Sequence, residues 1–178
     1  MRNTLILLLG LLATANQSQA QYKALDQGSA IKFTINNFGF GVAGSFTGLQ
    51  GTIDFDPRNL TSGKFDVSVD AATVNTDNSL RDSHLRNDSY FDVKNYPRIR
   101  LLSSRIVPMG PDGTYQFTGQ LTIKTVTKEI SFPFSATPAG DGFDFKGSFT
   151  INRRDFGVGG TSTISNELTV SLHVMATK

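Results

Sequence analysis

The sequence predicts an all-β fold in which about eight antiparallel strands enclose a core, with one short helix beside them. Apolar and polar residues alternate with period two over most of the chain, a pattern typical of strands with one buried face. Short connections rich in Pro, Gly, Asp and Asn separate these segments. No long amphipathic helix is available to cover an open sheet. The sheet is therefore expected to fold onto itself, as a sandwich or as a closed barrel.

The clearest strand covers residues 143–152, where Phe143, Phe145, Gly147, Phe149 and Ile151 share one face. The segments 114–124 and 168–175 alternate in the same way. Five further segments fit a strand: 30–35, 46–55, 63–70, 99–106 and 129–137. Turn residues gather at 56–59, 108–113 and 138–142, between the predicted strands.

Residues 77–87 lack alternation and predict the short helix. Asp77, Asn78 or Ser79 is suited to cap its start. Leu80 and His84 fall on one helical face, and Asp82 and Arg86 have the spacing of an opposite-charge pair.

Composition narrows the class of function. The 178 residues fit one domain, and 17 Lys and Arg against 15 Asp and Glu are too balanced for a nucleic-acid-binding face. The chain has 14 Phe, no Trp and no Cys, so it favours a fully apolar interior and excludes disulfides and thiolate metal sites. With two His and no Cys, a zinc site is not expected, and we predict no metal and no cofactor.

Residues 1–20 are interpreted as a secretory signal peptide, which leaves 21–178 as the mature domain. Arg2 supplies the positive charge, residues 5–12 the apolar stretch, and Ser18 and Ala20 the small residues before cleavage. A membrane anchor is the alternative, but the apolar run is shorter than the ~20 residues that a span requires. The predicted location is periplasmic or secreted.

A barrel of about eight strands is wide enough to be filled by side chains or to hold one small ligand. Gly119 and Gly147 lie on inward faces between large apolar residues. They either mark bends of the barrel or leave room for a guest, and the sequence supports both interpretations.

Four stretches resemble the YceI-like family, in the order of that family and over nearly the whole mature chain. They are the helix and loop 81–97, with Arg-Asp-Ser-His-Leu-Arg and Tyr-Phe-Asp-Val, the glycine-aromatic segment 38–46, the strand 115–124, and Ile-Asn-Arg-Arg-Asp-Phe-Gly-Val at 151–158. Three positions depart from the family pattern: Asn37 replaces a His, Thr125 a Gly and Leu101 an aromatic residue.

The resemblance implies an extended eight-stranded antiparallel lipocalin-like β-barrel, with the short helix near its mouth. It implies that a polyisoprenoid or a fatty-acid-like lipid binds in the bore. The residues expected to contact this lipid are Phe33, Ile35, Phe38, Phe40, Phe46, Phe65, Val67, Phe91, Leu101, Phe117, Leu121, Phe132, Phe134, Phe143, Phe145, Phe149, Phe156 and Val170.

Two polar residues are candidates for head-group contacts. His84 either donates a hydrogen bond to a ligand at the barrel mouth or packs as a structural residue of the helix. Arg153 either meets a lipid phosphate or forms a salt bridge with Asp155 that closes the barrel end. His173 falls on the polar face of its strand and is expected at the surface.

The sequence therefore favours an exported lipid carrier or scavenger. The alternatives are a structural or interaction module of the cell envelope with a filled core, and an enzyme on the same barrel. No catalytic motif is present in the sequence, so we expect no enzyme activity and no catalytic residue. The expected partner is the lipid, without nucleic acid or a membrane-spanning segment, and a homodimer is an open option.

Overall fold

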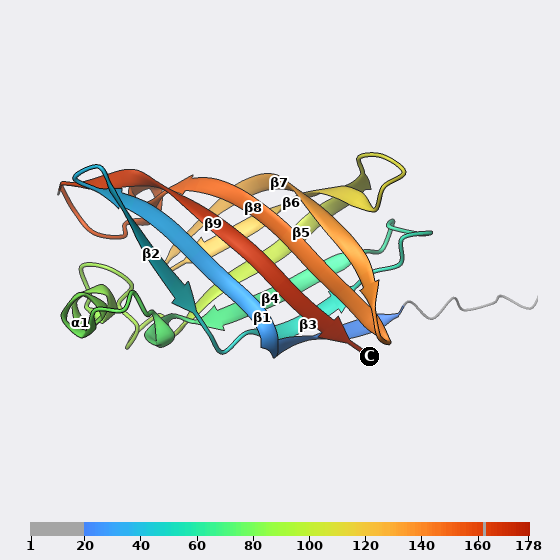
Figure 1. Ribbon diagram of the computed structural model, residues 1–178, viewed down its shortest axis with the longest axis horizontal. Helices are drawn as coiled ribbons and strands as arrows, with labels where there is room; N and C mark the ends of the chain where they lie inside the picture. The colour runs from blue at the N-terminus through green and yellow to red at the C-terminus, as the bar shows by residue number, and fades with distance from the viewer. Residues whose placement is uncertain (1–19, 162) are drawn as a thin grey trace, which may run out of the picture.

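In the computed structural model, residues 20–161 and 163–178 are described, and they form an elongated β-barrel (Figure 1). The predicted signal peptide lies outside the described residues, except for Ala20. The strands are β1 (Gln21–Asn37), β2 (Phe40–Phe46), β3 (Gln50–Asp54), β4 (Lys64–Asp70), β5 (Arg98–Pro108), β6 (Thr114–Ile123), β7 (Val126–Ala139), β8 (Gly142–Asn152) and β9 (Ile164–Thr177). One α-helix is described, α1 (Ser79–Arg86), with short 3₁₀ turns at Ala71–Thr73 and Arg153–Phe156.

Eight antiparallel strands close the barrel, as the sequence predicts. The order runs β1-β3-β4-β5-β6-β7-β8-β9, and β9 pairs back onto β1. β2 adds a ninth strand, which pairs with the C-terminal half of β1 from Ile31↔Phe46 to Asn37↔Phe40. β3 pairs with the other end of β1, so β2 and β3 follow one another along one edge of that strand.

The two ends of the barrel differ (Figure 1). One end carries α1, the β1–β2 hairpin and the connection from β8 to β9, and we call it the helix end. The opposite end carries the C-terminus and the β5–β6 and β7–β8 turns. The position of α1 confirms the expectation of one short helix at an end of the barrel.

Alternation predicts the inward faces correctly. Tyr115, Phe117 and Leu121 of β6 are buried, whereas Gln120 between them is exposed. His173 lies on the outer face, where its Nε2 is 2.8 Å from a carboxylate oxygen of Asp144.

The N-terminal part of the barrel differs from the sequence prediction. β1 begins at Gln21 instead of residue 30, and a register shift between Leu25 and Ala30 hides its periodicity. The predicted strand 46–55 is two strands, because Gly48 has a φ of +70° and the chain turns between Phe46 and Gln50. β2 is absent from the predicted strands because its Gly-rich sequence lacks a clear apolar face.

Helix α1 begins after Asn78, whose side chain accepts a hydrogen bond from the amide of Arg81. This confirms one of the three predicted caps. The predicted Asp82–Arg86 pair is wrong. Asp82 is buried and accepts hydrogen bonds from Thr76, while Arg86 donates to the carbonyl oxygens of Ala72 and Val74. Both residues therefore fasten α1 to the preceding loop.

Aromatic rings of this chain occupy the space beside the inward glycines. A Cβ added at Gly119 would collide with the ring of Phe117, and one at Gly147 would lie 3.0 Å from the ring of Phe132. Gly119 also pairs with Ser103, where the β5–β6 register shifts, so it marks a bend as well.

Candidate functional site

The helix-end half of the barrel is hollow. A cavity of about 480 Å³ lies between β1, β2, β4, β5, β6, β8 and β9, and α1 borders it. Its apolar wall consists of Ile31, Phe33, Ile35, Val42, Phe46, Leu49, Val67, Val69, Leu80, Leu85, Tyr90, Phe91, Ile99, Leu101, Leu121, Ile123, Phe149, Ile151, Val158, Ile164, Leu168, Val170, Leu172 and Val174. A cavity of this size and character is suited to a small apolar ligand.

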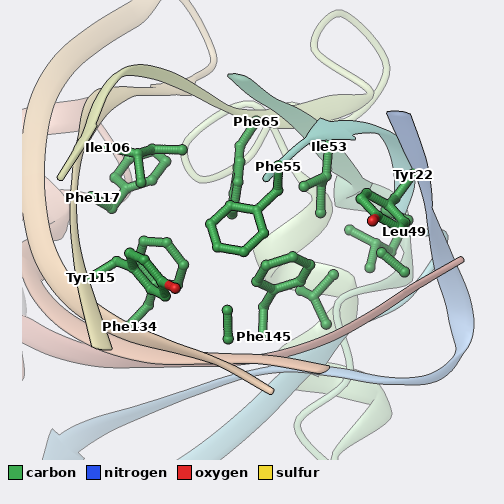
Figure 2. Close-up of a cluster of buried hydrophobic side chains, with 14 of the residues drawn as sticks. Tyr22, Leu49, Ile53, Phe55, Phe65, Ile106, Tyr115, Phe117, Phe134 and Phe145 are labelled. Carbon is green, nitrogen blue, oxygen red and sulfur yellow. The ribbon is translucent and has the colours of Figure 1, made fainter. Parts of the chain in front are cut away.

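The other half of the barrel is filled by aromatic side chains. Phe55 follows β3, is fully buried, and packs against the rings of Phe65, Tyr115, Phe134, Phe143 and Phe145, with centroid distances of 5.1–6.4 Å. Figure 2 shows Phe55 and Phe65 near the middle of the barrel, with Tyr115, Phe134 and Phe145 around them. We call Phe55 and its five ring partners Phe65, Tyr115, Phe134, Phe143 and Phe145 the aromatic plug. Most of these contacts are edge-to-face, the geometry that aromatic quadrupoles favour.

Neighbouring aromatic rings connect the plug to the cavity. Phe132 lies 4.8 Å from Phe117 and 4.7 Å from Phe149, measured between ring centroids. Phe149 lines the cavity, whereas Phe117 and Phe132 are buried below it. A ligand that enters from the helix end is therefore stopped by aromatic side chains partway along the barrel.

Polar residues lie at the rim on the helix side. Arg81 donates from Nε to the Thr76 hydroxyl and from an Nη to the Thr76 carbonyl, both at 2.7 Å. Thr76 in turn donates its amide and its hydroxyl to Asp82, which anchors this chain of bonds. Arg81 and His84 both border the cavity, and His84 is exposed.

Arg153 is buried beside the cavity and holds the connection between β8 and β9. Its Nε donates to the Ser165 carbonyl at 3.0 Å, and Nη1 donates to the Val158 carbonyl at 2.8 Å. Its acceptors include main-chain oxygens, whereas the sequence suggested a salt bridge with the Asp155 carboxylate. This is a structural role at the barrel end, and the contacts of Arg153 and His84 with a ligand head group stay predictions.

The predicted lipid contacts fall into three groups. Half of them line the cavity: Phe33, Ile35, Phe46, Val67, Phe91, Leu101, Leu121, Phe149 and Val170. The second group packs among other side chains away from the cavity wall. Phe156 of this group lies in a smaller cluster beside the cavity. The others lie in the main core: Phe65, Phe117, Phe132, Phe134, Phe143 and Phe145. Phe38 and Phe40 are 72% and 77% exposed and lie outside the cavity, because they occupy the tip of the β1–β2 hairpin.

Several lining residues were not among the predicted contacts. Ile123, Ile151, Leu168 and Leu172 lie on apolar faces that the alternation identifies, so the signal for them was present. Leu80, Leu85 and Tyr90 come from the helix and its loop, where period two gives no information.

An ion pair on the surface shifts the pKa of a carboxyl group. On the outer face, Arg100 forms a two-bond pair with Asp66, at 2.8 and 2.6 Å. This hydrogen-bonded guanidinium lowers the pKa of the Asp66 carboxyl below its ordinary value.

In the part of the chain that is described, no helix is long and apolar enough to cross a membrane.

Comparison with known proteins gives consistent matches. The family model of the YceI-like domain matches residues 22–176. A UPF0312 protein of Pseudomonas savastanoi is 30% identical over 173 residues, which are 90% of this chain and 88% of that protein.

Two solved structures share the fold. BcnA of Burkholderia cenocepacia superposes with a TM-score of 0.78 at 24% identity, covering 84% of this chain and 96% of that one. A polyisoprenoid binding domain from Saccharophagus degradans, implicated in plant cell wall breakdown, gives 0.74 at 16% identity, covering 88% and 97%.

Proposed function

The chain belongs to the YceI-like domain family, and on that premise we propose that it binds a polyisoprenoid or another amphiphilic lipid in the helix-end cavity. The observation that carries this proposal is the apolar cavity of about 480 Å³ between the aromatic plug and α1. The polyisoprenoid binding domain of Saccharophagus degradans, with the same fold, supports this class of ligand.

The size of the cavity limits the buried part of the ligand. At the roughly 30 Å³ that one water occupies in the liquid, the space corresponds to about 16 small groups. Burying about 16 methylenes at ~0.8 kcal/mol each gives roughly 13 kcal/mol before costs. Immobilising the ligand costs about 4–15 kcal/mol. At the low end of this cost about 9 kcal/mol remains, which corresponds to roughly micromolar binding without a charged anchor. A tail much longer than this would protrude from the mouth.

The orientation of the ligand follows from the distribution of polar groups. The tail lies against Phe149, Leu101 and Val170, and the head group stays at the rim near Arg81 and His84. Asn37 also borders the mouth, and its buried Oδ1 has no hydrogen-bond partner within the described part of the chain. Such an acceptor is suited to a ligand donor, because a buried unpaired acceptor is costly.

The proposed role is that of an exported carrier or scavenger in the periplasm or outside the cell, which binds without catalysis. The apolar leader with Arg2 and the small residues at 18 and 20 supports export. A carrier that holds its lipid by apolar contacts releases it without a chemical step.

A cavity-filling variant tests the binding site. Val170 lines the cavity between Phe33 and Phe149 of the neighbouring strands, so Val170→Phe adds a ring to the space that the tail needs. Losing the burial of two methylenes or more should weaken the affinity for a fluorescent prenyl or fatty-acyl probe by at least about tenfold.

Thr169→Phe is the matched control, because it adds a ring one residue away on the exposed face. It should bind the probe as the unchanged protein does. Equal affinity of both variants would place the probe elsewhere and defeat the proposal.

A further inference from the structure

We propose that the tip of the β1–β2 hairpin, with Phe38 and Phe40, docks the helix end of the barrel onto a lipid bilayer. This inference rests on the proposed lipid binding, because it supplies the route by which a water-insoluble ligand reaches the cavity. The same end of the barrel carries α1 (Figure 1), whose residues border the cavity.

The hairpin tip exposes large apolar side chains. Phe38 and Phe40 are 72% and 77% exposed, among the largest values for apolar residues in the described chain. Single exposed apolar residues are ordinary, but Phe38 on the two-residue turn and Phe40 directly after it form a local apolar tip. Rings in this position are suited to the bilayer interface.

Phe38 is also held in an unfavourable backbone conformation. The turn residues Phe38 and Gly39 have φ of +51° and +82°, the pattern of a type I′ hairpin turn. Gly, Asn and Asp are preferred in such turns, whereas a bulky residue in this region is an outlier. A phenylalanine that costs backbone energy and gains little burial is consistent with a functional role.

The hairpin carries no charge. From Phe33 to Ile53 the sequence contains no Asp, Glu, Lys or Arg, although 18% of the whole chain is charged. The tip can therefore approach a hydrocarbon boundary without removing water from an ionised group, which is the most costly part of burial.

The tip adjoins the cavity mouth. Ile35, Asn37 and Val42, which flank the turn, line the cavity. Leu80 on α1 also lines it and is 68% exposed, so the helix contributes an apolar side chain to the same end. Contact through the tip would bring the mouth to the membrane, where an amphiphile can enter tail first.

A bilayer fits this surface better than a second copy of the chain. A stable protein interface needs about 800 Å² per partner with complementary shape, which two rings on a hairpin tip do not provide. Insertion of single apolar side chains into the interface of a bilayer needs no complementary shape. The mixed charges of α1, Asp82 beside Arg81 and Arg86, give no reason to require an anionic lipid.

The test uses vesicles of dioleoylphosphatidylcholine and protein recovered from cells that express the full chain. Phe38→Asn with Phe40→Thr keeps residues suited to the turn and to the strand. Met109→Ser is the matched control, because Met109 is 56% exposed on the β5–β6 turn at the opposite end.

In flotation assays, the unchanged protein and Met109→Ser should bind the vesicles equally, and the double variant at least about tenfold more weakly. The double variant should unfold at the same temperature or a higher one, because Phe38→Asn relieves the strained turn. It should keep its affinity for a soluble fluorescent probe in vesicle-free buffer, since neither ring lines the cavity.

Vesicle binding that is absent in the unchanged protein, or equal in the double variant, would overturn the docking surface. A double variant that loses self-association in light scattering, with vesicle binding intact, would assign the tip to a second copy and overturn it as well. Tip-dependent vesicle binding by a protein that takes up no probe would uphold docking and defeat the proposed function.

Discussion

Replacing Phe55 with alanine should destabilise the barrel strongly, because this side chain lies at the centre of the aromatic plug. It is fully buried and contacts five aromatic rings. Large-to-small substitution of a buried Phe costs about 3–5 kcal/mol in the free energy of unfolding. For a domain of this size, each kcal/mol lowers the melting temperature by about 2–4 °C, so Phe55→Ala should melt roughly 6–20 °C lower.

Urea unfolding followed by circular dichroism measures this loss, and an unchanged m-value would show that the unfolding transition is otherwise the same. Phe40→Ala removes the same side chain from an exposed position and should change the free energy of unfolding by only about 0.5 kcal/mol. A loss for Phe55→Ala below about 1 kcal/mol, or no larger than for Phe40→Ala, would refute the packing described for the closed half.

Two further predictions concern polar groups. Asp82→Ala leaves the Thr76 amide and hydroxyl without their acceptor and should lower the free energy of unfolding by about 1–3 kcal/mol, with faster hydrogen exchange of the α1 amides. Asp82→Asn keeps an acceptor and should lose less stability. Equal exchange in the unchanged protein and both variants would contradict this prediction. In the folded protein, the hydrogen bond from Arg100 lowers the pKa of Asp66 below the ordinary value of 3.8. The pair therefore stabilises the fold at pH values above 3.8, and this stabilisation is lost as the pH falls through the pKa of Asp66 in the folded state. Because Arg100 is half exposed, this contribution should stay below about 1 kcal/mol, and Arg100→Gln should raise the Asp66 pKa in an NMR titration; an unmoved pKa would contradict the pairing.

The antiparallel strands and their inward faces could be predicted from the sequence because period two is a direct consequence of strand geometry, whereas the choice of a closed barrel over a sandwich came from the family resemblance. Phe145, Phe149 and Ile151 point inward in the structure as the alternation indicates. The start of β1 and the break between β2 and β3 could not be predicted in this way. A register shift after Leu25 and the turn at Gly48 interrupt the period without changing the sheet.

Periodicity could not predict that one half of the interior is filled by side chains and the other half is hollow. Phe117 and Phe149 are both inward phenylalanines of long strands, yet one is buried in the core and the other faces the cavity. What separates them is the set of neighbours that each ring meets, and these come from strands far apart in the sequence: Phe117 packs against Phe65 of β4, whereas Phe149 borders the cavity. Phe55, which follows a strand and fills the centre, shows this most clearly, since its neighbours come from β4, β6, β7 and β8.

The glycines illustrate a second limit of sequence reasoning. An inward glycine suggests empty space, and Gly119 and Gly147 were candidates for positions that leave room for a guest. The rings of Phe117 and Phe132 occupy those places. The free volume lies instead above Phe132, where branched aliphatic residues such as Val67 and Val170 line the wall.

Native mass spectrometry of the protein, purified without detergent from the cells that make it, tests the central claim most directly. A single amphiphile should remain bound to the unchanged protein and to Thr169→Phe, and its occupancy should fall sharply in Val170→Phe. Protein that is free of any amphiphile in every such preparation, or equally loaded in Val170→Phe, would contradict the account of a lipid held in the helix-end cavity.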